Sequence, residues 1–130
     1  MTHPHFTFVV LEKDHFVAQD MCAGLADAAP GCQFLHLAVS DIPDDLLATL
    51  AGIGGLPVLV TKAQISEMDG CALVRDWTRN GWPIVLRLGI DPVEDIRARG
   101  WYPLAAPFTR DDLDDLVRRL TLGEKDRRLA

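Results

Sequence analysis

The chain has 130 residues, of which 48% are hydrophobic, and its 19 acidic and 13 basic side chains give a net charge of −6. That length is enough for one domain with a hydrophobic core and too short for two. Binding to a phosphate backbone needs a local excess of lysine and arginine, which this acidic sequence lacks, so we expect no nucleic-acid binding by this domain.

The sequence has no feature of an exported or membrane-inserted protein. Its first residues lack the basic start and apolar run of a signal peptide, and no segment has the roughly 18 apolar residues of a membrane span. Cys22, Cys32 and Cys71 are widely spaced among apolar neighbours, which favours reduced core thiols over disulfides or a zinc site. We therefore expect a cytoplasmic protein with no membrane contact, no metal and no other cofactor.

Short apolar runs rich in β-branched residues alternate with segments of helical apolar spacing, a pattern typical of βαβ units around a parallel sheet. In chain order, the pattern predicts five strands, at 6–11, 34–39, 56–60 and 83–88, with a weak one at 104–106. A helix is predicted after each strand. The first has apolar residues from 18 to 28, the second opens near 41–43, the third begins near 69–70, the fourth is short and lies within 91–100, and the last follows Thr109.

The final helix has the best-marked boundaries. Thr109 is placed to cap it, acidic side chains fill its first turn, and Arg118 and Arg119 lie near its carboxyl end. Beyond its apolar stripe the sequence turns polar. We expect residues 1–122 to form a single domain, and residues 123–130 to be a polar tail or the remnant of a linker.

Polar residues that leave the strands are the first candidates for function, because ligands bind at the carboxyl ends of strands in an open parallel sheet. Glu12, Lys13 and Asp14 follow the first strand, and Lys62 follows the third. On its own, Lys62 could simply be a solvated residue at a strand end. No serine, cysteine or histidine is placed convincingly as a nucleophile with its base, so we do not expect an enzyme.

The order of elements and four motifs resemble the receiver domain of two-component response regulators. These motifs are VVLEKDHFVAQDM at 9–21, ISEMDGCALVRDW at 65–77, PIVLRL at 83–88 and APF at 106–108, and the resemblance covers roughly residues 6 to 121. It implies an α/β, flavodoxin-like (CheY-like) fold, a doubly wound five-stranded parallel sheet of (βα)5 type with strand order 2-1-3-4-5. It also implies a cis bond between Ala106 and Pro107.

The same resemblance implies that the phosphorylation chemistry has been lost. Receiver domains hold magnesium with two acids after strand one, phosphorylate an aspartate at the end of strand three, and read the result with a Ser/Thr after strand four and a lysine before Pro-Phe. Glu12 matches the first acid, but Lys13 occupies the second position and Asp14 follows it. The remaining positions of this degenerate phosphorylation pocket are Lys62 for the phosphoacceptor, Leu88 for the Ser/Thr (or Arg87 if the register slips by one) and Ala106 for the lysine.

These replacements are consistent in electrostatic terms. Two unit charges about 4 Å apart interact by roughly 4 kcal/mol at an effective dielectric of 20, so two ammonium groups in the pocket disfavour a bound dication. We hypothesise that Lys62 forms an internal ion pair with Glu12 or Asp14 in the space of the metal and phosphoryl group.

We therefore expect an atypical, pseudo-receiver signalling domain that acts through a protein partner, either a signalling protein or an output domain, or as a homodimer. In the family, helix four, strand five and helix five carry dimerisation or output, which makes Trp101, Tyr102, Leu104 and Phe108 the candidate interaction surface. Two alternatives remain open. The altered pocket could sense a small ligand, or the domain could be the N-terminal regulatory part of a longer transcriptional or antitermination regulator.

Overall fold

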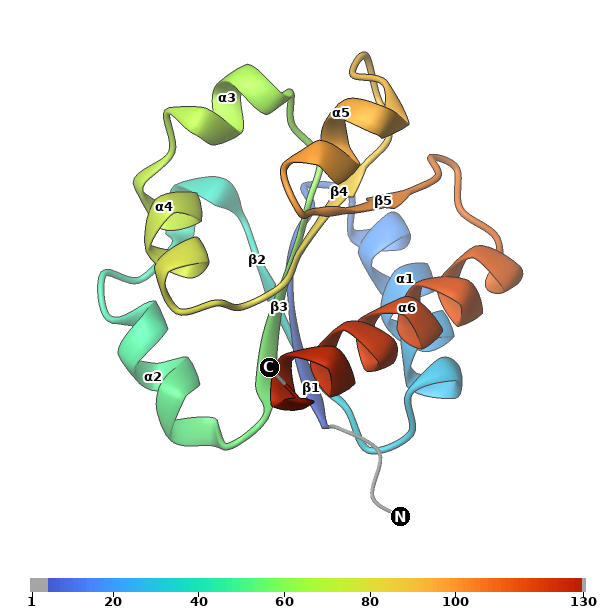
Figure 1. The fold of residues 1–130 in the computed structure, drawn as a ribbon, viewed down its shortest axis with the longest axis horizontal. Helices are drawn as coiled ribbons and strands as arrows, with labels where there is room; N and C mark the ends of the chain where they lie inside the picture. The colour runs from blue at the N-terminus through green and yellow to red at the C-terminus, as the bar shows by residue number, and fades with distance from the viewer. Residues whose placement is uncertain (1–4, 130) are drawn as a thin grey trace.

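Five parallel strands form a single sheet in the computed structural model, which describes residues 5–129 and, of their side chains, those of residues 5–124 (Figure 1). The order across the sheet is β2-β1-β3-β4-β5, and each neighbouring pair is parallel. The predicted flavodoxin-like (CheY-like) sheet is therefore confirmed. The strands are β1 Phe6–Leu11, β2 Gln33–Leu37, β3 Leu56–Thr61, β4 Ile84–Arg87 and β5 Tyr102–Leu104.

Helices cover both faces of the sheet, as a doubly wound fold requires. α1 and α6 pack together on one face, and α2, α3 and α4 lie on the other (Figure 1). The helices are α1 His15–Ala28, α2 Leu46–Ile53, α3 Ile65–Asp69, α4 Ala72–Arg79, α5 Val93–Ala98 and α6 Arg110–Leu129, and a 3-10 turn, η1, spans Val39–Asp41.

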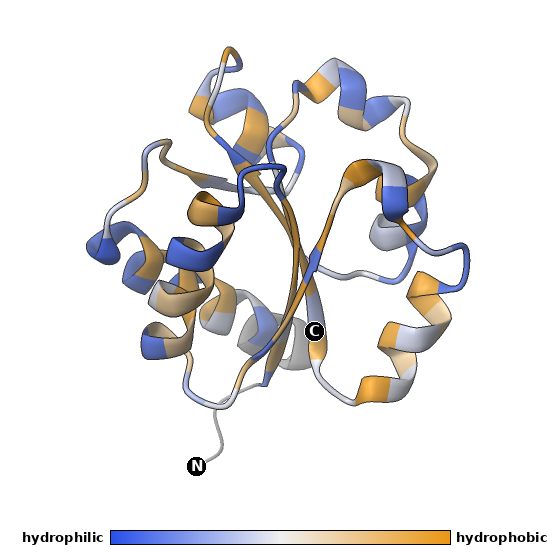
Figure 2. Ribbon diagram, turned by 180° about the vertical axis from the view of Figure 1, so that it is seen from behind, coloured by the Kyte–Doolittle hydropathy of each residue, from blue (hydrophilic) through white to orange (hydrophobic). Residues whose placement is uncertain are grey.

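The inner strand β1 divides its apolar side chains between two apolar clusters. Phe6, Phe8 and Val10 pack with α1 and α6, whereas Val9 and Leu11 pack with the helices of the opposite face. Successive residues of a strand point to opposite faces, so a strand buried on both sides is apolar throughout. Figure 2 shows this as continuous apolar colour along the inner strands. Within the described residues, no helix combines the length and apolarity needed to cross a membrane.

The cysteines are half-buried free thiols, in agreement with the sequence prediction. Burial raises the pKa of the Cys22 and Cys32 thiols above the ordinary range. A raised pKa leaves less thiolate near neutral pH, so these groups are weaker nucleophiles than an exposed cysteine.

The third helical region differs from the prediction because it is broken in two. Between the predicted strand at 56–60 and the helix predicted to begin near 69–70 lies the short helix α3, whose Ile65 and Met68 are buried. Glu67 accepts a hydrogen bond from the Gln64 amide at 3.0 Å, and Asp91 accepts one from the Ile65 amide at 2.8 Å. These acceptors satisfy amide groups that the start of a helix leaves unpaired. They stabilise α3, because five residues are too few to form a stable helix on their own.

Two strands also differ in their limits. β2 ends at Leu37, and the chain enters η1 at Val39 where the sequence predicted continued strand. The fifth strand begins at Tyr102, two residues earlier than the predicted weak strand at 104–106. The Ala106–Pro107 bond that follows is cis, as predicted.

The last helix continues beyond the predicted limit. Thr109 and Asp112 cap its start reciprocally, with amide-to-side-chain distances of 2.8 and 3.1 Å, as the sequence suggested. Its backbone then stays helical to Leu129, through the segment predicted as a polar tail. A Cβ atom placed on Gly123 would lie 2.2 Å from the Tyr102 hydroxyl oxygen, so the glycine permits a close approach between α6 and β5.

Candidate functional site

The carboxyl ends of the strands meet at one edge of the sheet and bring the predicted pocket positions to that edge. The pairing of Val10 with Val60 places Glu12 and Lys62 at neighbouring strand exits. β4 ends at Arg87, and Leu88 follows, its amide bonded to the Leu104 carbonyl at 2.7 Å. The sheet therefore places the exits of β1, β3 and β4 side by side, as expected for this fold.

A buried ion pair joins two of these exits. Arg87 donates from Nη1 to Glu12 Oε2, and the two side chains are only 8% and 12% exposed. The other oxygen, Glu12 Oε1, accepts a hydrogen bond from the Asp14 amide at 3.1 Å. The Arg87 guanidinium also lies over the Phe108 ring, 5.8 Å from its centroid, in cation–π geometry. Glu12 thus has both oxygens occupied, and Arg87 ties β1 to β4 and to the segment after β5.

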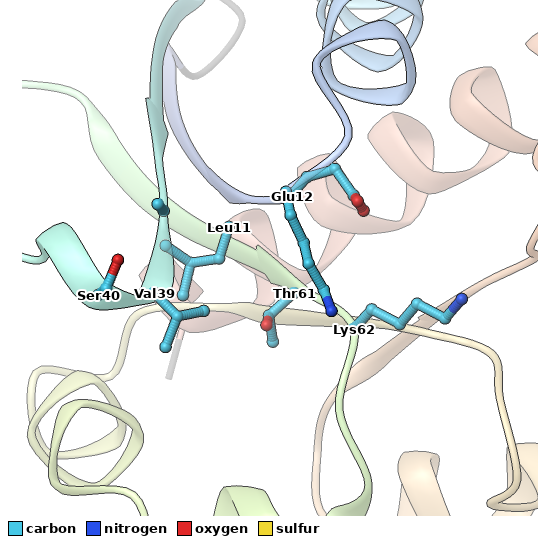
Figure 3. A pocket seen from close by; sticks show the side chains of 8 residues that line it. Leu11, Glu12, Val39, Ser40, Thr61 and Lys62 are labelled. Carbon is cyan, nitrogen blue, oxygen red and sulfur yellow. The ribbon is translucent and has the colours of Figure 1, made fainter.

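The predicted internal ion pair of Lys62 is wrong. Lys62 is exposed and makes no ion pair with any residue that the structure describes, and Figure 3 shows its side chain extending away from Leu11 and Val39. A cation does pair with Glu12, but it comes from β4. The sequence signal for it was the single charge in the apolar run PIVLRL, which the alternative register placed at the Ser/Thr position.

Asp14 has a structural role. Its carboxylate caps α1 and accepts from the amides of Phe16 at 2.9 Å and Val17 at 3.4 Å. An N-cap carboxylate satisfies unpaired amides of the first turn and lies favourably near the positive end of the helix. Lys13, between these two acids in the sequence, is exposed. Of the acids, Glu12 is paired with Arg87 and Asp14 caps α1.

His36 supports the β1 exit from the neighbouring strand. Its Nε2 hydrogen-bonds to the Glu12 carbonyl oxygen, and because a carbonyl only accepts, Nε2 must carry the proton. Its ring meets the edge of the His15 ring with centroids 5.3 Å apart. In the described part of the chain, no three histidine, cysteine or acidic side chains are grouped to hold a metal ion.

The residues at this edge do not fit the magnesium ion of receiver domains. Mg²⁺ requires oxygen ligands in near-octahedral geometry. Glu12 is committed to Arg87, Asp14 is committed to α1, and ammonium groups stand at the other two acid positions. The donor set is therefore unsuited to a hard dication.

A cavity of about 570 Å³ opens beside the ion pair, between the ends of β1, β2 and β3 (Figure 3). A second cavity, of about 250 Å³, shares Leu11, Val39, Thr61 and Lys62 with it and continues along apolar residues of α3 and α4. Sequence reasoning did not consider the exit of β2, and so missed the three lining residues that follow this strand. The residues that line the larger cavity are Leu11, Glu12, Lys13, Ala38, Val39, Ser40, Thr61 and Lys62.

The predicted interaction residues do not form one surface. Leu104 is 2% exposed and belongs to the core beneath α1 and α6, so its assignment to an interaction surface is corrected. Trp101, just before β5, and Tyr102, its first residue, are half-buried and pack on opposite faces of the sheet, as successive residues of an extended chain do. Phe108 is half-buried and lies beside Arg87. Trp101, Tyr102 and Phe108 retain accessible surface, but Trp101 packs against a different apolar cluster from Tyr102 and Phe108.

Comparison with known proteins identifies the fold. No protein-family model and no curated protein matches the chain. A solved structure of a transiently phosphorylated "switch" in bacterial signal transduction superposes with a TM-score of 0.60 and 20% sequence identity, over 91% of this chain and 94% of that one. The chain has a receiver-type fold. At 20% identity the receiver-type likeness concerns the arrangement of strands and helices, and phosphorylation is a property of the other protein.

Proposed function

We propose that this domain is a receiver-like signalling module that is not phosphorylated in the usual way and acts by contact with other proteins. The observation that carries the proposal is the buried ion pair between Arg87 and Glu12. In receiver domains, the acid at the position of Glu12 helps to hold the magnesium ion that neutralises charge during phosphoryl transfer. In this chain, a guanidinium group from β4 already neutralises that acid.

Magnesium at Glu12 would have to compete with Arg87. The pair is largely shielded from water, and leaving one partner of a buried pair alone costs about 3–5 kcal/mol. Magnesium also gives up its hydration water reluctantly and needs several oxygen ligands to replace it. Lys13 and Lys62 offer no such oxygen at the other two positions. Both charge and donor chemistry therefore oppose the metal.

The acceptor and the readout positions are altered as well. Phosphorylation in receiver domains forms an acyl phosphate on an aspartate, but a lysine ammonium has no lone pair with which to attack phosphorus. Leu88 has no hydroxyl and Ala106 has no cation, so the positions that would respond to a phosphoryl group lack the means to do so. Each step of the usual switch therefore lacks a participant.

Protein contact is the mode of action that the fold analogy favours. The face built from α5, β5 and α6 corresponds to the dimerisation and output surface of receiver domains, and α6 carries an exposed apolar residue, Leu122, at 55% exposure. Pro103 lies in the edge strand β5 and has no amide to donate, which disfavours extension of the sheet by another strand. We expect a signalling protein, an output domain or a second copy of the chain to bind through side chains instead.

The proposal is tested by incubating the protein with acetyl phosphate and Mg²⁺ and measuring its intact mass. We expect no phosphoryl adduct and no magnesium-dependent change in tryptophan fluorescence. A receiver domain that keeps the complete acid pocket, treated in parallel, is the positive control. A base-labile adduct that disappears on replacement of Glu12 or Asp14 would contradict the proposal.

A further inference from the structure

The cavity between the ends of β1, β2 and β3 has a positively charged mouth. Lys13 and Lys62 both line it, both are exposed, and neither forms an ion pair with another residue in the described part of the chain. The lysine stem is flexible and its ammonium group is a compact charge with three donors, so both groups can turn toward a bound anion. Two unopposed ammonium groups at one opening attract negative charge.

The acids nearby do not cancel this charge. Glu12 lines the cavity but is paired with Arg87, and Figure 3 shows its carboxylate turned away from Leu11 and Val39. The Asp14 carboxylate is bonded to amides at the start of α1. Among the described residues, neither lysine therefore has a carboxylate within ion-pair distance.

The inside of the cavity is mainly apolar and offers hydroxyl groups. Leu11, Ala38 and Val39 form its apolar wall, and Val39 is 71% exposed, an unusual degree for a valine. Thr61 and Ser40 contribute hydroxyls, and Thr61 is buried although its hydroxyl makes no hydrogen bond to another described residue. The second cavity extends the apolar wall beneath α3 through Leu59 and Met68.

The geometry points to a binding site for a small amphiphilic anion, an organic carboxylate or phosphate monoester whose charged group is held by Lys13 and Lys62 and whose apolar body lies against Leu11 and Val39. A volume of about 570 Å³ lies within the range of small-molecule sites, which combine an apolar lining with a few convergent polar groups. Thr61 is placed to donate a hydrogen bond to the charged group.

This inference goes beyond the proposed function, which requires no ligand. The cavity spans the exits of β2, β1 and β3, whereas Arg87, the cation of the ion pair, comes from the exit of β4. Ligand binding would provide an input that does not depend on phosphorylation. The two proposals fail separately, because one is read by phosphoryl mass and the other by binding of an unreactive probe.

The test uses phenyl phosphate and hexanoate as probes, with inorganic phosphate and hexanol as the corresponding fragments. Isothermal titration calorimetry and thermal unfolding should show saturable binding of at least one amphiphilic probe, with a higher Tm at higher probe concentration. Inorganic phosphate and hexanol should each bind at least tenfold more weakly, because each makes only part of the contacts. Comparison of the two amphiphilic probes distinguishes a carboxylate site from a phosphate site.

Variants locate the site. Lys13→Gln and Lys62→Gln should each weaken binding about tenfold or more, as expected for loss of a charge-assisted hydrogen bond. Arg75→Gln removes the same charge from an exposed position on α4 outside the cavity and should leave binding unchanged. Ala38→Leu, at an exposed position, should reduce binding by filling the cavity without disturbing the core.

Three results would overturn the inference. These are no saturable binding of either amphiphilic probe, equal binding of inorganic phosphate and phenyl phosphate, and losses in Arg75→Gln that match those in the lysine variants. Amide chemical-shift changes confined to residues outside the β1, β2 and β3 exits would also contradict it.

Discussion

At the scale of single residues, the sequence predicted which positions carry unusual chemistry but not how their charges pair. Lys13 and Lys62 were recognised as cations at acid positions, yet the buried partner of Glu12 is Arg87. Since β3 lies between β1 and β4, this contact depends on the order of strands and on the reach of an arginine side chain across a strand end. No local pattern encodes such a contact, and so sequence reasoning assigned the partner to the nearer lysine.

The ion pair leads to a prediction about stability. Arg87→Met should lower the free energy of unfolding by about 3 kcal/mol or more, because it leaves Glu12 charged and shielded. Glu12→Gln/Arg87→Met should lose less than the sum of its single variants, with a coupling of about 1 kcal/mol or more. Urea unfolding followed by circular dichroism measures all four proteins.

The matched control is an exposed arginine–carboxylate pair, Arg99 with Asp69, whose side chains are 44% and 46% exposed. Breaking it with Arg99→Met should cost about 1 kcal/mol or less, since exposed pairs contribute little. Equal losses for the two arginines, or strictly additive losses in the Glu12 and Arg87 cycle, would show that burial gives the first pair no special role.

At the scale of elements, apolar spacing predicted the order of strands and long helices, but not where tertiary contacts start or stop them. α3 was not predicted because its apolar residues, Ile65 and Met68, are too few for a periodic pattern. Asp91, which accepts a hydrogen bond from the Ile65 amide, lies far along the chain. α6 was shortened because a glycine followed by polar residues is a normal helix ending. In both cases the neighbouring element, not the local sequence, sets the boundary.

The extension of α6 predicts opposite effects for two helical glycines. Gly52→Ala, on α2, should stabilise the protein by about 0.5–1 kcal/mol, because a Cβ there meets no atom within 4 Å and alanine is the better helix former. Gly123→Ala should destabilise it, because the new Cβ would lie 2.2 Å from the Tyr102 hydroxyl oxygen. Thermal unfolding of both variants measures whether each substitution raises or lowers the Tm.

A double variant separates the clash from helix propensity. Tyr102→Phe removes the hydroxyl and leaves the nearest ring carbon 3.5 Å from the new Cβ, an ordinary contact. Gly123→Ala should therefore cost less, or become stabilising, in the Tyr102→Phe background. If Gly123→Ala stabilises the unmodified protein as much as Gly52→Ala does, α6 does not approach β5 as described.

At the scale of the whole molecule, the framework was predictable because apolar periodicity survives extensive substitution. Only 20% of residues are shared with the superposed signal-transduction switch, yet 91% of the chain follows the same path. The cavity at the β1, β2 and β3 exits was not predictable, because its walls come from a turn at Ala38 to Ser40 whose path is set by packing. With the framework intact, the proposed absence of phosphorylation depends on a few side chains.

That dependence can be tested by restoring the pocket in two steps. A variant with Lys13→Asp, Lys62→Asp and Ala106→Lys rebuilds the acids and the lysine but keeps Arg87 on Glu12, and we expect it to remain unphosphorylated by acetyl phosphate and Mg²⁺. Adding Arg87→Thr frees Glu12 for the metal and supplies a hydroxyl, so the fourfold variant should gain a magnesium-dependent, base-labile phosphoryl adduct. Intact mass measures the adduct, and circular dichroism checks that both variants are folded.

If the threefold variant is phosphorylated as readily as the fourfold one, the Arg87 ion pair does not block the site. If both are folded and inert, the loss lies in the backbone framework and not in these side chains.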